Sequence, residues 1–355
     1  MTKVVVALSG GVDSSVAAAL LVRQGFDVEG VTMRLWSAPG CENENRCCTP
    51  ETRLTAQNLA DGLHIPFTVL DAQDLFRKQV VQPFLDGYSR GDTPNPCIFC
   101  NRYLKWGQLL DYARTVNADF IATGHYAKIT KTQNGNYELR RGADETKDQS
   151  YFLSLLTQSH LSRTLFPLAD LHKSEVRQIA HDFDLPAADQ PESQDLCFVG
   201  NRNYGEFLAE FAPEVVNPGE IRHLNGSLLG KHEGLAFYTI GQRKRLPASS
   251  QALYVVDKDM AQNCLIVGGL EDLGKQNMIV PTVNWILGAQ PEPNFLSEIK
   301  IRSNSIPKPA QVNVATDGTA QVTFYEPIRD ITPGQMAVFY DGDLVLGGGI
   351  IEKAF

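Results

Sequence analysis

The chain opens on a hydrophobic pattern that predicts a buried strand running directly into a helix. Residues 4–8 are apolar and mostly β-branched, which is typical of a strand covered on both faces. The polar and glycine-rich segment 9–15 follows at once, and the apolar run 16–22 then has the pattern of a helix. A strand that passes through glycines into the start of a helix is a common way to bind an anion.

Alternating strand and helix patterns continue through the first half of the chain. We expect strands at 28–34, 66–71 and 120–123, and helices at 51–63, 72–90 and 100–114. Strands separated by helices predict a doubly wound α/β domain, a parallel sheet with helices on both faces. The loops that follow its strands, 9–15, 33–50 and 124–126, are expected to converge on one pocket at the carboxyl edge of the sheet.

The second half of the chain has a different pattern. Helical periodicity fades after about residue 212, and prolines and glycines interrupt short segments up to residue 277. From residue 278 short alternating segments predict strands at near-regular spacing, which favours a barrel or sandwich. We therefore expect three domains: a nucleotide-binding domain at 1–204, a small mixed α+β module at 205–277, and a β-barrel-like domain at 278–355.

Composition and charge narrow the class of protein. Of the 355 residues 43% are hydrophobic and 21% charged, as in soluble globular proteins. No apolar run approaches the ~20 residues that span a bilayer, and the N-terminus leads directly into the first strand, so we expect a cytoplasmic protein without membrane contact. The net charge of −9 argues against a non-specific polyanion binder but leaves room for local basic patches.

The glycine-rich loop carries the first candidate chemistry. Its sequence, Ser9-Gly10-Gly11-Val12-Asp13-Ser14-Ser15, lacks the Lys-Ser/Thr ending of the Walker P-loop. It resembles the pyrophosphate loop of ATP pyrophosphatases, enzymes that adenylate a carbonyl oxygen and release pyrophosphate. ATP is then the expected cofactor, with Mg²⁺ near Asp13 to neutralise the phosphates.

Two further segments place cysteines in polar, accessible sequence. In segment 93–102 two prolines precede Cys97 and Cys100, and we expect Cys100 at or near a helix N-terminus, which favours the thiolate. We therefore interpret Cys100 as a nucleophile. The alternative is a metal or iron–sulfur half-site formed by Cys97 and Cys100, completed by Cys41, Cys47 or Cys48, although their spacing fits no regular zinc pattern.

The third landmark is segment 192–198, which contains Cys197. A cysteine between Leu196 and Phe198 is by default a small buried hydrophobe, but the polar residues before it favour an accessible loop. Structural disulfides are improbable in a cytoplasmic chain with seven cysteines, an odd number.

Taken in order, these segments make the chain resemble the bacterial tRNA-specific 2-thiouridylases, and the resemblance runs along its whole length. These enzymes replace the 2-oxygen of the anticodon wobble uridine with sulfur. The matching segments are 7–15, 93–101, 122–127, 147–151, 193–198, 238–244, 333–335 and 337–340.

The resemblance implies a role for each matched residue. Cys100 and Cys197 are the expected catalytic pair: Cys197 carries a persulfide received from a sulfur-relay protein, and Cys100 releases the sulfur, leaving a disulfide to be reduced. The residues implied for ATP are Ala7, Leu8, Ser9, Gly10, Gly11, Val12, Asp13, Ser14, Met33 and Gly124. Those implied for the tRNA are Asn95, Pro96 and Cys97 at the target base, with His125, Lys147, Asp148, Gln149, Arg302, Ser303 and Gln335 elsewhere.

The chain departs from the family pattern at two places. The family often has Asp, a proposed proton carrier, where Cys97 stands, and often Arg-Tyr-Arg in place of Arg302-Ser303-Asn304. Two other function classes compete with thiolation. One is an ATP pyrophosphatase acting on a small metabolite or a different tRNA base, which would not need two separated cysteines or the C-terminal β domain. The other is a non-enzymatic RNA-binding protein, which the intact loop disfavours.

Overall fold

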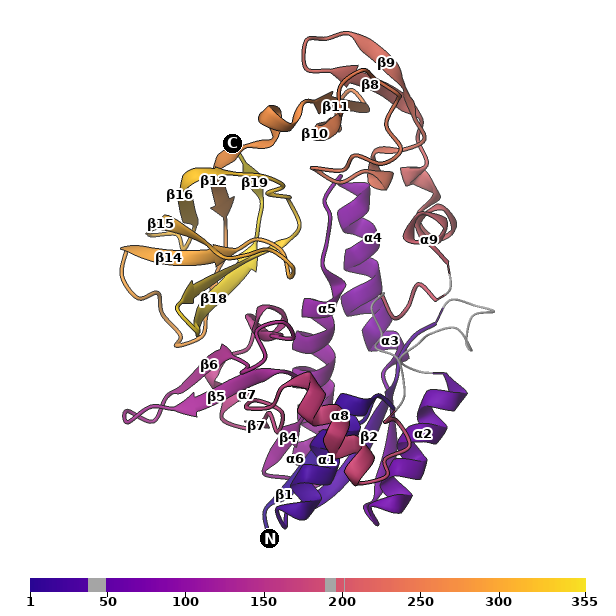
Figure 1. The fold of residues 1–355 in the computed structure, drawn as a ribbon, viewed down its shortest axis with the longest axis vertical. Coiled ribbons are helices and arrows are strands. Elements are labelled where there is room, and N and C mark those ends of the chain that lie inside the picture. The colour runs from indigo at the N-terminus through magenta and orange to yellow at the C-terminus, as the bar shows by residue number, and fades with distance from the viewer. Residues whose placement is uncertain (38–48, 189–195, 201) are drawn as a thin grey trace.

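The computed structural model describes residues 1–37, 49–188, 196–200 and 202–355. Its first domain is built on a five-stranded parallel sheet in the order β3-β2-β1-β4-β7 (Figure 1). The expected doubly wound α/β class is confirmed. The strands are β1 (Lys3–Ala7), β2 (Asp27–Arg34), β3 (Phe67–Asp71), β4 (Phe120–Ala122) and β7 (Thr164–Leu165).

Alternate residues of β1 show why helices cover both faces of this sheet. Val4 and Val6 pack into one buried cluster with α1 (Val12–Arg23), α2 (Pro50–Gly62) and α8 (Lys173–Asp182). Val5 packs into another with α6 (Leu110–Thr115) on the opposite face. Every second side chain of a strand points to the same face, so a continuous apolar run is needed to fill both.

Two long helices leave the sheet toward the rest of the molecule. One runs without interruption through α3 (Gln73–Phe76), η1 (Arg77–Val81) and α4 (Gln82–Ser89), the second through α5 (Pro96–Phe99), η2 (Cys100–Leu109) and α6. Segments η1 and η2 are π-helical, a geometry often found at functional sites. The second helix begins at Pro96, four residues before the expected start at 100, because a proline suits the first turn of a helix.

The middle module combines α9 (Tyr204–Phe211) with a four-stranded sheet in the order β10-β11-β8-β9. Its core is continuous with the first long helix, since Phe84 meets Phe198 and Phe207 edge to face at ring distances of 5.3 and 6.3 Å. The module is therefore packed on the first domain through aromatic side chains. Its strands are β8 (Gly219–His223), β9 (Leu228–His232), β10 (Tyr254–Asp259) and β11 (Cys264–Gly268).

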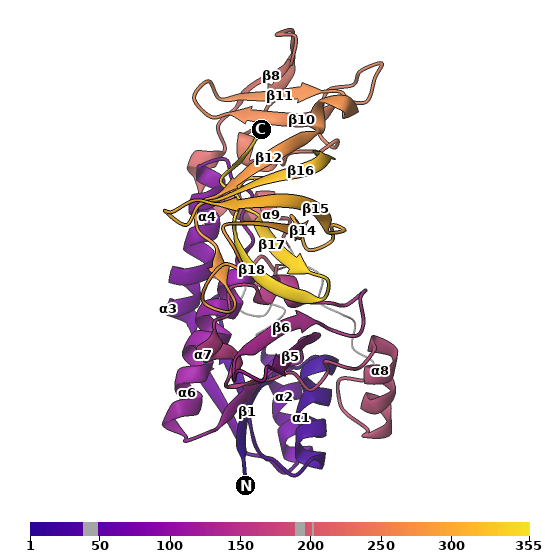
Figure 2. The ribbon, with the colours of Figure 1, turned by 90° about the vertical axis from the view of Figure 1, so that its left-hand side faces the viewer.

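The C-terminal strands form an antiparallel sheet that extends into the first domain. Strand β18 (Leu344–Ile350) pairs with β6 (Tyr137–Arg141), which forms a hairpin with β5 (Ala127–Lys131). Figure 2 shows the sheet passing from the C-terminal strands to this hairpin. The remaining strands are β12 (Lys275–Val280), β13 (Asn284–Trp285), β14 (Asn294–Lys300), β15 (Lys308–Val314), β16 (Ala320–Ile328), β17 (Met336–Asp341) and β19 (Lys353–Ala354).

This hairpin was not predicted from the sequence, and it makes the C-terminal strands less independent than expected. Leu139 of β6 shares a buried cluster with Met336, Val338 and Val345. The short connectors η3 (Ser150–Leu153) and α7 (Gln158–Leu161) lie at the same junction. Across the described ranges, no helix is both long and apolar enough to cross a membrane.

Candidate active site

The glycine-rich loop lies between β1 and α1 and is shaped by local hydrogen bonds. The Ser9 N–H donates to Ser14 Oγ at 3.2 Å, and Ser14 Oγ donates to the Gly11 carbonyl at 3.0 Å. Gly10 has φ +77°, and a Cβ there would lie 2.6 Å from the Thr52 carbonyl oxygen. This position therefore requires glycine, and the loop presents backbone rather than side chains at the start of α1, as phosphate-binding loops do.

A buried lysine holds the acidic residue of this loop. Lys173, at the start of α8, donates to both carboxylate oxygens of Asp13 at 2.7 and 2.8 Å, and the Tyr126 hydroxyl donates to Oδ1 at 2.7 Å. The Lys173 side chain is only 11% exposed. Sequence analysis missed Lys173 and Tyr126, because no local pattern indicates that they meet a residue so distant in the chain.

The second long helix carries two of the candidate thiols. Cys97 lies in its first turn and is exposed, whereas Cys100 lies one turn further along and is half-buried. The stabilising effect of a helix N-terminus on a thiolate therefore acts more directly on Cys97 than the sequence interpretation assumed. Both side chains face the same pocket as the glycine-rich loop.

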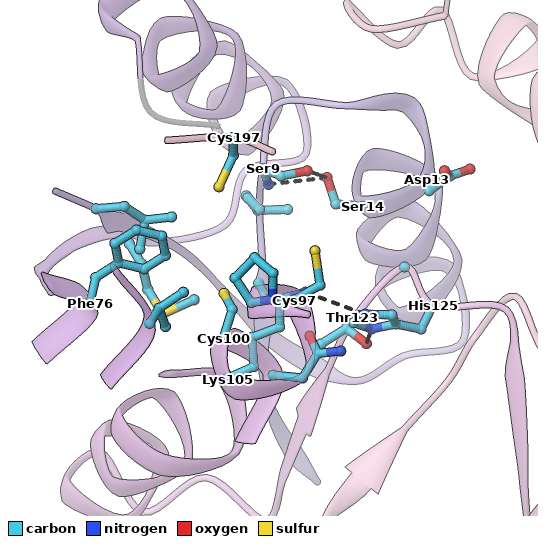
Figure 3. Close-up of a pocket in the computed structure, with 18 of the residues that line it drawn as sticks. Ser9, Asp13, Ser14, Phe76, Cys97, Cys100, Lys105, Thr123, His125 and Cys197 are labelled. Atoms are coloured by element: carbon cyan, nitrogen blue, oxygen red, sulfur yellow. Dashed lines mark hydrogen bonds between the residues drawn. The ribbon is translucent and has the colours of Figure 1, made fainter. Parts of the chain in front are cut away.

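One pocket of about 340 Å³ brings the loop and the cysteines together (Figure 3). Cys197 enters it from the opposite side to Cys97 and Cys100, with Ser9 and Ser14 beside it. Of the sequence-predicted residues, the pocket is lined by Ala7, Leu8, Ser9, Asp13, Ser14, Met33, Pro96, Cys97, Cys100, Gly124, His125, Gln149 and Cys197. Gly10, Gly11 and Val12 are not among its lining, and the Val12 side chain is buried in the core beneath α1.

Gly124 and His125 form the wall between the phosphate loop and the second long helix. A Cβ on Gly124 would lie 2.6 Å from the Asp13 carbonyl carbon, so β4 can approach the loop closely only with glycine there. His125 is buried, with Nδ1 2.7 Å from Thr123 Oγ1 and Nε2 3.3 Å from Lys105 Nζ. Burial and the neighbouring Lys105 ammonium hold the His125 pKa well below its usual value, so the ring is neutral at pH 7.

Family models match nearly the whole chain in three consecutive parts. Residues 2–201 match the tRNA methyl transferase HUP domain, 205–269 the tRNA methyl transferase PRC-barrel domain, and 275–351 the aminomethyltransferase β-barrel domain. The tRNA-specific 2-thiouridylase MnmA of Natranaerobius thermophilus is 47% identical over 99% of this chain and 98% of its own. The chain belongs to the tRNA-specific 2-thiouridylase family.

Other members of this family are similarly close. The tRNA-specific 2-thiouridylase MnmA of Chloroflexus aggregans is 45% identical over 99% of both chains. Among solved structures, a 4-thiouridine synthetase–RNA complex with bound ATP matches 60% of this chain and 51% of its own, with TM-score 0.36 and 16% identity. An NMN synthetase from Francisella tularensis matches 60% and 77%, with TM-score 0.34 and 18% identity.

The residues that the 2-thiouridylase resemblance implied for tRNA contact lie in three different settings. Pro96, Cys97, His125 and Gln149 line the pocket. Asp148 accepts hydrogen bonds from Ser150 within its own turn. Asn95, Lys147, Arg302, Ser303 and Gln335 lie outside the pocket lining.

Two of these outlying side chains connect domains. Arg302 donates from Nη2 to the Ile240 carbonyl of the middle module at 3.1 Å and to Thr332 Oγ1. Burial lowers the pKa of the Arg302 guanidinium. Gln335 donates to the backbone of the loop that precedes Cys97. Both side chains therefore hold the domains of this 2-thiouridylase in register, whatever else they contact.

The possible metal partners named from sequence, Cys41, Cys47 and Cys48, lie outside the described residues, as do 192–195. Within the described part of the chain, no group of three or more His, Cys, Asp or Glu side chains has the geometry to hold a metal ion. Asp13 is the carboxylate beside the phosphate loop, and both of its oxygens already accept from Lys173. Among the described residues that line this 2-thiouridylase pocket, Asp13 is the one carboxylate that could face a metal ion.

Proposed function

We propose that this protein is an ATP-dependent tRNA-uridine 2-sulfurtransferase that acts on the wobble uridine of the anticodon. The observation that carries the proposal is the single pocket lined by the phosphate loop, Cys100 and Cys197. Relatives that match the chain from end to end bear the name tRNA-specific 2-thiouridylase. An ATP pyrophosphatase acting on a small metabolite would have no use for two thiols that reach one pocket from distant segments.

The phosphate loop and its neighbours would bind ATP. The backbone from Ser9 to Ser14 would hold the phosphates at the start of α1, while Met33 and Gly124 would border the nucleoside. Mg²⁺ would be held by phosphate oxygens, with Asp13 nearby, and would neutralise their charge. Asp13 already accepts hydrogen bonds from Lys173 and Tyr126, so a metal ion that it coordinated would share its carboxylate with both of them.

The cysteines would supply the sulfur chemistry. The wobble base would leave its stack to enter the pocket beside Asn95, Pro96 and Cys97, and adenylation would turn its 2-oxygen into a leaving group. A persulfide on Cys197, delivered by a sulfur-relay protein, would attack C2 and displace AMP. Cys100 would then attack the S–S bond, leaving sulfur on the base and a Cys100–Cys197 disulfide for an external reductant.

The test is mass spectrometry of tRNA after incubation with the protein, ATP, Mg²⁺ and a persulfide donor, with pyrophosphate and AMP measured in the same samples. We expect a mass gain of one sulfur-for-oxygen exchange at the wobble uridine, with AMP and pyrophosphate formed only when tRNA is present. ADP and inorganic phosphate as the main products would exclude the proposal. Thiolation at another position would move the substrate to a different tRNA base.

A further inference from the structure

Lys105 belongs to the pocket but to none of the roles assigned so far. It lies in η2 on the same helix face as Cys100, and both line the pocket. A π-helix closes its hydrogen bonds five residues apart, so Lys105 returns above Cys100 where a regular α-helix would turn it away. The unusual helix geometry thus turns Lys105 toward the pocket that Cys100 also lines.

The contacts of His125 fix how Lys105 is held. An ammonium group only donates hydrogen bonds, so His125 Nε2 accepts from Lys105 Nζ at 3.3 Å. Nδ1 then carries the ring proton and donates to Thr123 Oγ1 at 2.7 Å. Trp106 and Phe166 pack on the ring at 5.7 and 6.1 Å, so His125 is a rigid, neutral acceptor for the lysine.

Lys105 is the basic side chain that the described residues contribute to the lining of the pocket, apart from the neutral His125. Among the described residues that line it, Lys105 is the lysine, and none is an arginine. Lys173 is nearby but is engaged with Asp13. His125 follows Gly124, whose backbone lies against the Asp13–Ser14 peptide, so the partner of Lys105 is the chain neighbour of a residue that touches the phosphate loop. Lys105 and the loop residues Ser9, Asp13 and Ser14 line the same pocket.

We propose that Lys105 is a further catalytic residue, whose ammonium contacts the α-phosphate during adenylation, and that His125 is the positioning residue that aims it. This inference rests on the proposed function. The uridine 2-oxygen forms a bond to the α-phosphorus, the bond from that phosphorus to the bridging oxygen breaks, and the electron pair leaves with pyrophosphate. The N3 proton of the base passes to solvent. Lys105 keeps its protons and stabilises the added negative charge of the transition state.

The first experiment compares Lys105→Met with Lys105→Arg in single-turnover pyrophosphate release at saturating ATP and tRNA. We expect Lys105→Met to slow release by about 100-fold, the usual loss for one transition-state donor, with an unchanged tRNA Kd. Lys105→Arg should recover part of the rate. Lys128→Met is the matched control, because Lys128 is an exposed lysine paired with Asp170 outside this pocket.

The second experiment separates positioning by His125 from direct tRNA contact. His125→Phe keeps an aromatic ring against Trp106 and Phe166 but removes the acceptor for Lys105. We expect a slower release step with an unchanged tRNA Kd. A weaker Kd with a normal rate at saturation would mean that His125 contacts tRNA directly, and would overturn its positioning role.

The outcomes also separate this inference from the proposed function. If the unaltered protein releases no pyrophosphate with tRNA, the proposed function fails. If it does, and Lys105→Met releases pyrophosphate at the same rate, the proposed function stands and the role of Lys105 is overturned. Lys105 is only half-buried, so its variants are expected to fold even if His125→Phe does not.

Discussion

Gln335, near the end of the chain, donates from Nε2 to the Thr93 carbonyl at 2.7 Å, across 242 residues of sequence. The Thr93 N–H in turn donates to the Pro333 carbonyl at 2.9 Å. From the middle module, Lys258 Nζ donates to the Gly91 carbonyl at 2.7 Å. Both smaller domains therefore make hydrogen bonds to the loop that leads into the helix of Cys97 and Cys100. We expect these hydrogen bonds to fix the position of that loop.

Gly334→Ala should disturb the hydrogen bonds between the C-terminal domain and the Thr93 loop. Gly334 has φ +87°, and a Cβ there would lie 2.8 Å from Asp92 Cβ and 2.9 Å from the Thr93 nitrogen. We expect a loss of unfolding free energy above the ~1 kcal/mol of left-handed strain alone, and a slower thiolation step, because the Thr93 loop must move. Urea unfolding and single-turnover thiolation measure the two effects.

Gly318→Ala is the control for this variant. Gly318 has the same φ of +87° but nothing within 4 Å of its Cβ position, so it contributes backbone strain without a clash. We expect it to lower stability modestly and to leave the thiolation rate unchanged. Equal effects of the two variants on the thiolation rate would mean that the hydrogen bonds to Thr93 do not position Cys97 and Cys100.

Lys258 should make stability depend on pH in the alkaline range. Burial lowers its pKa from 10.5 to about 8. Between these values the unfolded chain binds the proton that the folded protein has lost, so raising the pH stabilises the folded state through this window. Below pH 8 the cost of burying the ammonium is present in full, and above pH 10.5 it is gone.

The measurement is the difference in unfolding free energy between the protein and Lys258→Met as a function of pH. The unfolding free energy of the unaltered protein should rise relative to that of Lys258→Met by up to about 3 kcal/mol between pH 8 and 10.5. The exposed Lys308, substituted in the same way, is the control for the loss of a lysine charge at the surface. A flat difference for Lys258 would contradict the prediction.

The Lys173–Asp13 pair should matter for stability more than a surface pair of equal geometry. Lys173→Met leaves the Asp13 carboxylate without its cation, and we expect a loss of about 2 kcal/mol because Lys173 is buried and Asp13 partly so. Asp13→Asn in the same chain should recover part of this loss. Lys128 and Asp170 are also 2.7 Å apart but well exposed, so Lys128→Met should cost less than about 1 kcal/mol in the same urea titration.

The sequence was a good guide wherever the signal is local. The β-branched run at Val4–Val6, the glycine-rich loop and the proline before Cys97 each determine nearby backbone, and the strands and pocket expected from them are present. The sequence was a poor guide where distant segments meet. Nothing near Lys173 indicates Asp13, and the polar alternation of the β5–β6 hairpin gives no sign of its pairing with β18.

This pairing also changes how the C-terminal domain can be tested. Deleting residues 278–355 would be the direct test if these residues formed an independent tRNA-binding unit. In the structure it would expose the edge of β6 and remove Met336, Val338 and Val345 from a shared core. Point substitutions in the domain are therefore the better probe of its expected contribution to tRNA binding.

The two candidate catalytic thiols should be needed for sulfur transfer but not for adenylation. Cys100→Ser and Cys197→Ser should each abolish thiolation, while tRNA-dependent pyrophosphate release survives in part, because the phosphate loop is untouched. Cys264 is the control: it is 4% exposed in β11 and is not among the residues that line the pocket. Cys264→Ser should lower stability without changing thiolation, and a normal thiolation rate in either of the other variants would exclude the two-thiol mechanism.

Cys97, where the family often has Asp, should tolerate that residue. The side chain lies in the first turn of α5 and is exposed at the pocket, where an acidic group is favoured by the helix N-terminus. A thiol is a weaker acid than a carboxyl group, so Cys97 cannot carry a proton in the way proposed for the Asp of other family members. We therefore expect Cys97→Asp to thiolate at a rate close to that of the unaltered protein.

Iron and zinc measured on protein purified without oxygen test the alternative, in which Cys97 is a metal ligand. Near-stoichiometric metal together with an inactive Cys97→Asp variant would make Cys97 a ligand, and the Cys100 thiolate would no longer be available as a nucleophile.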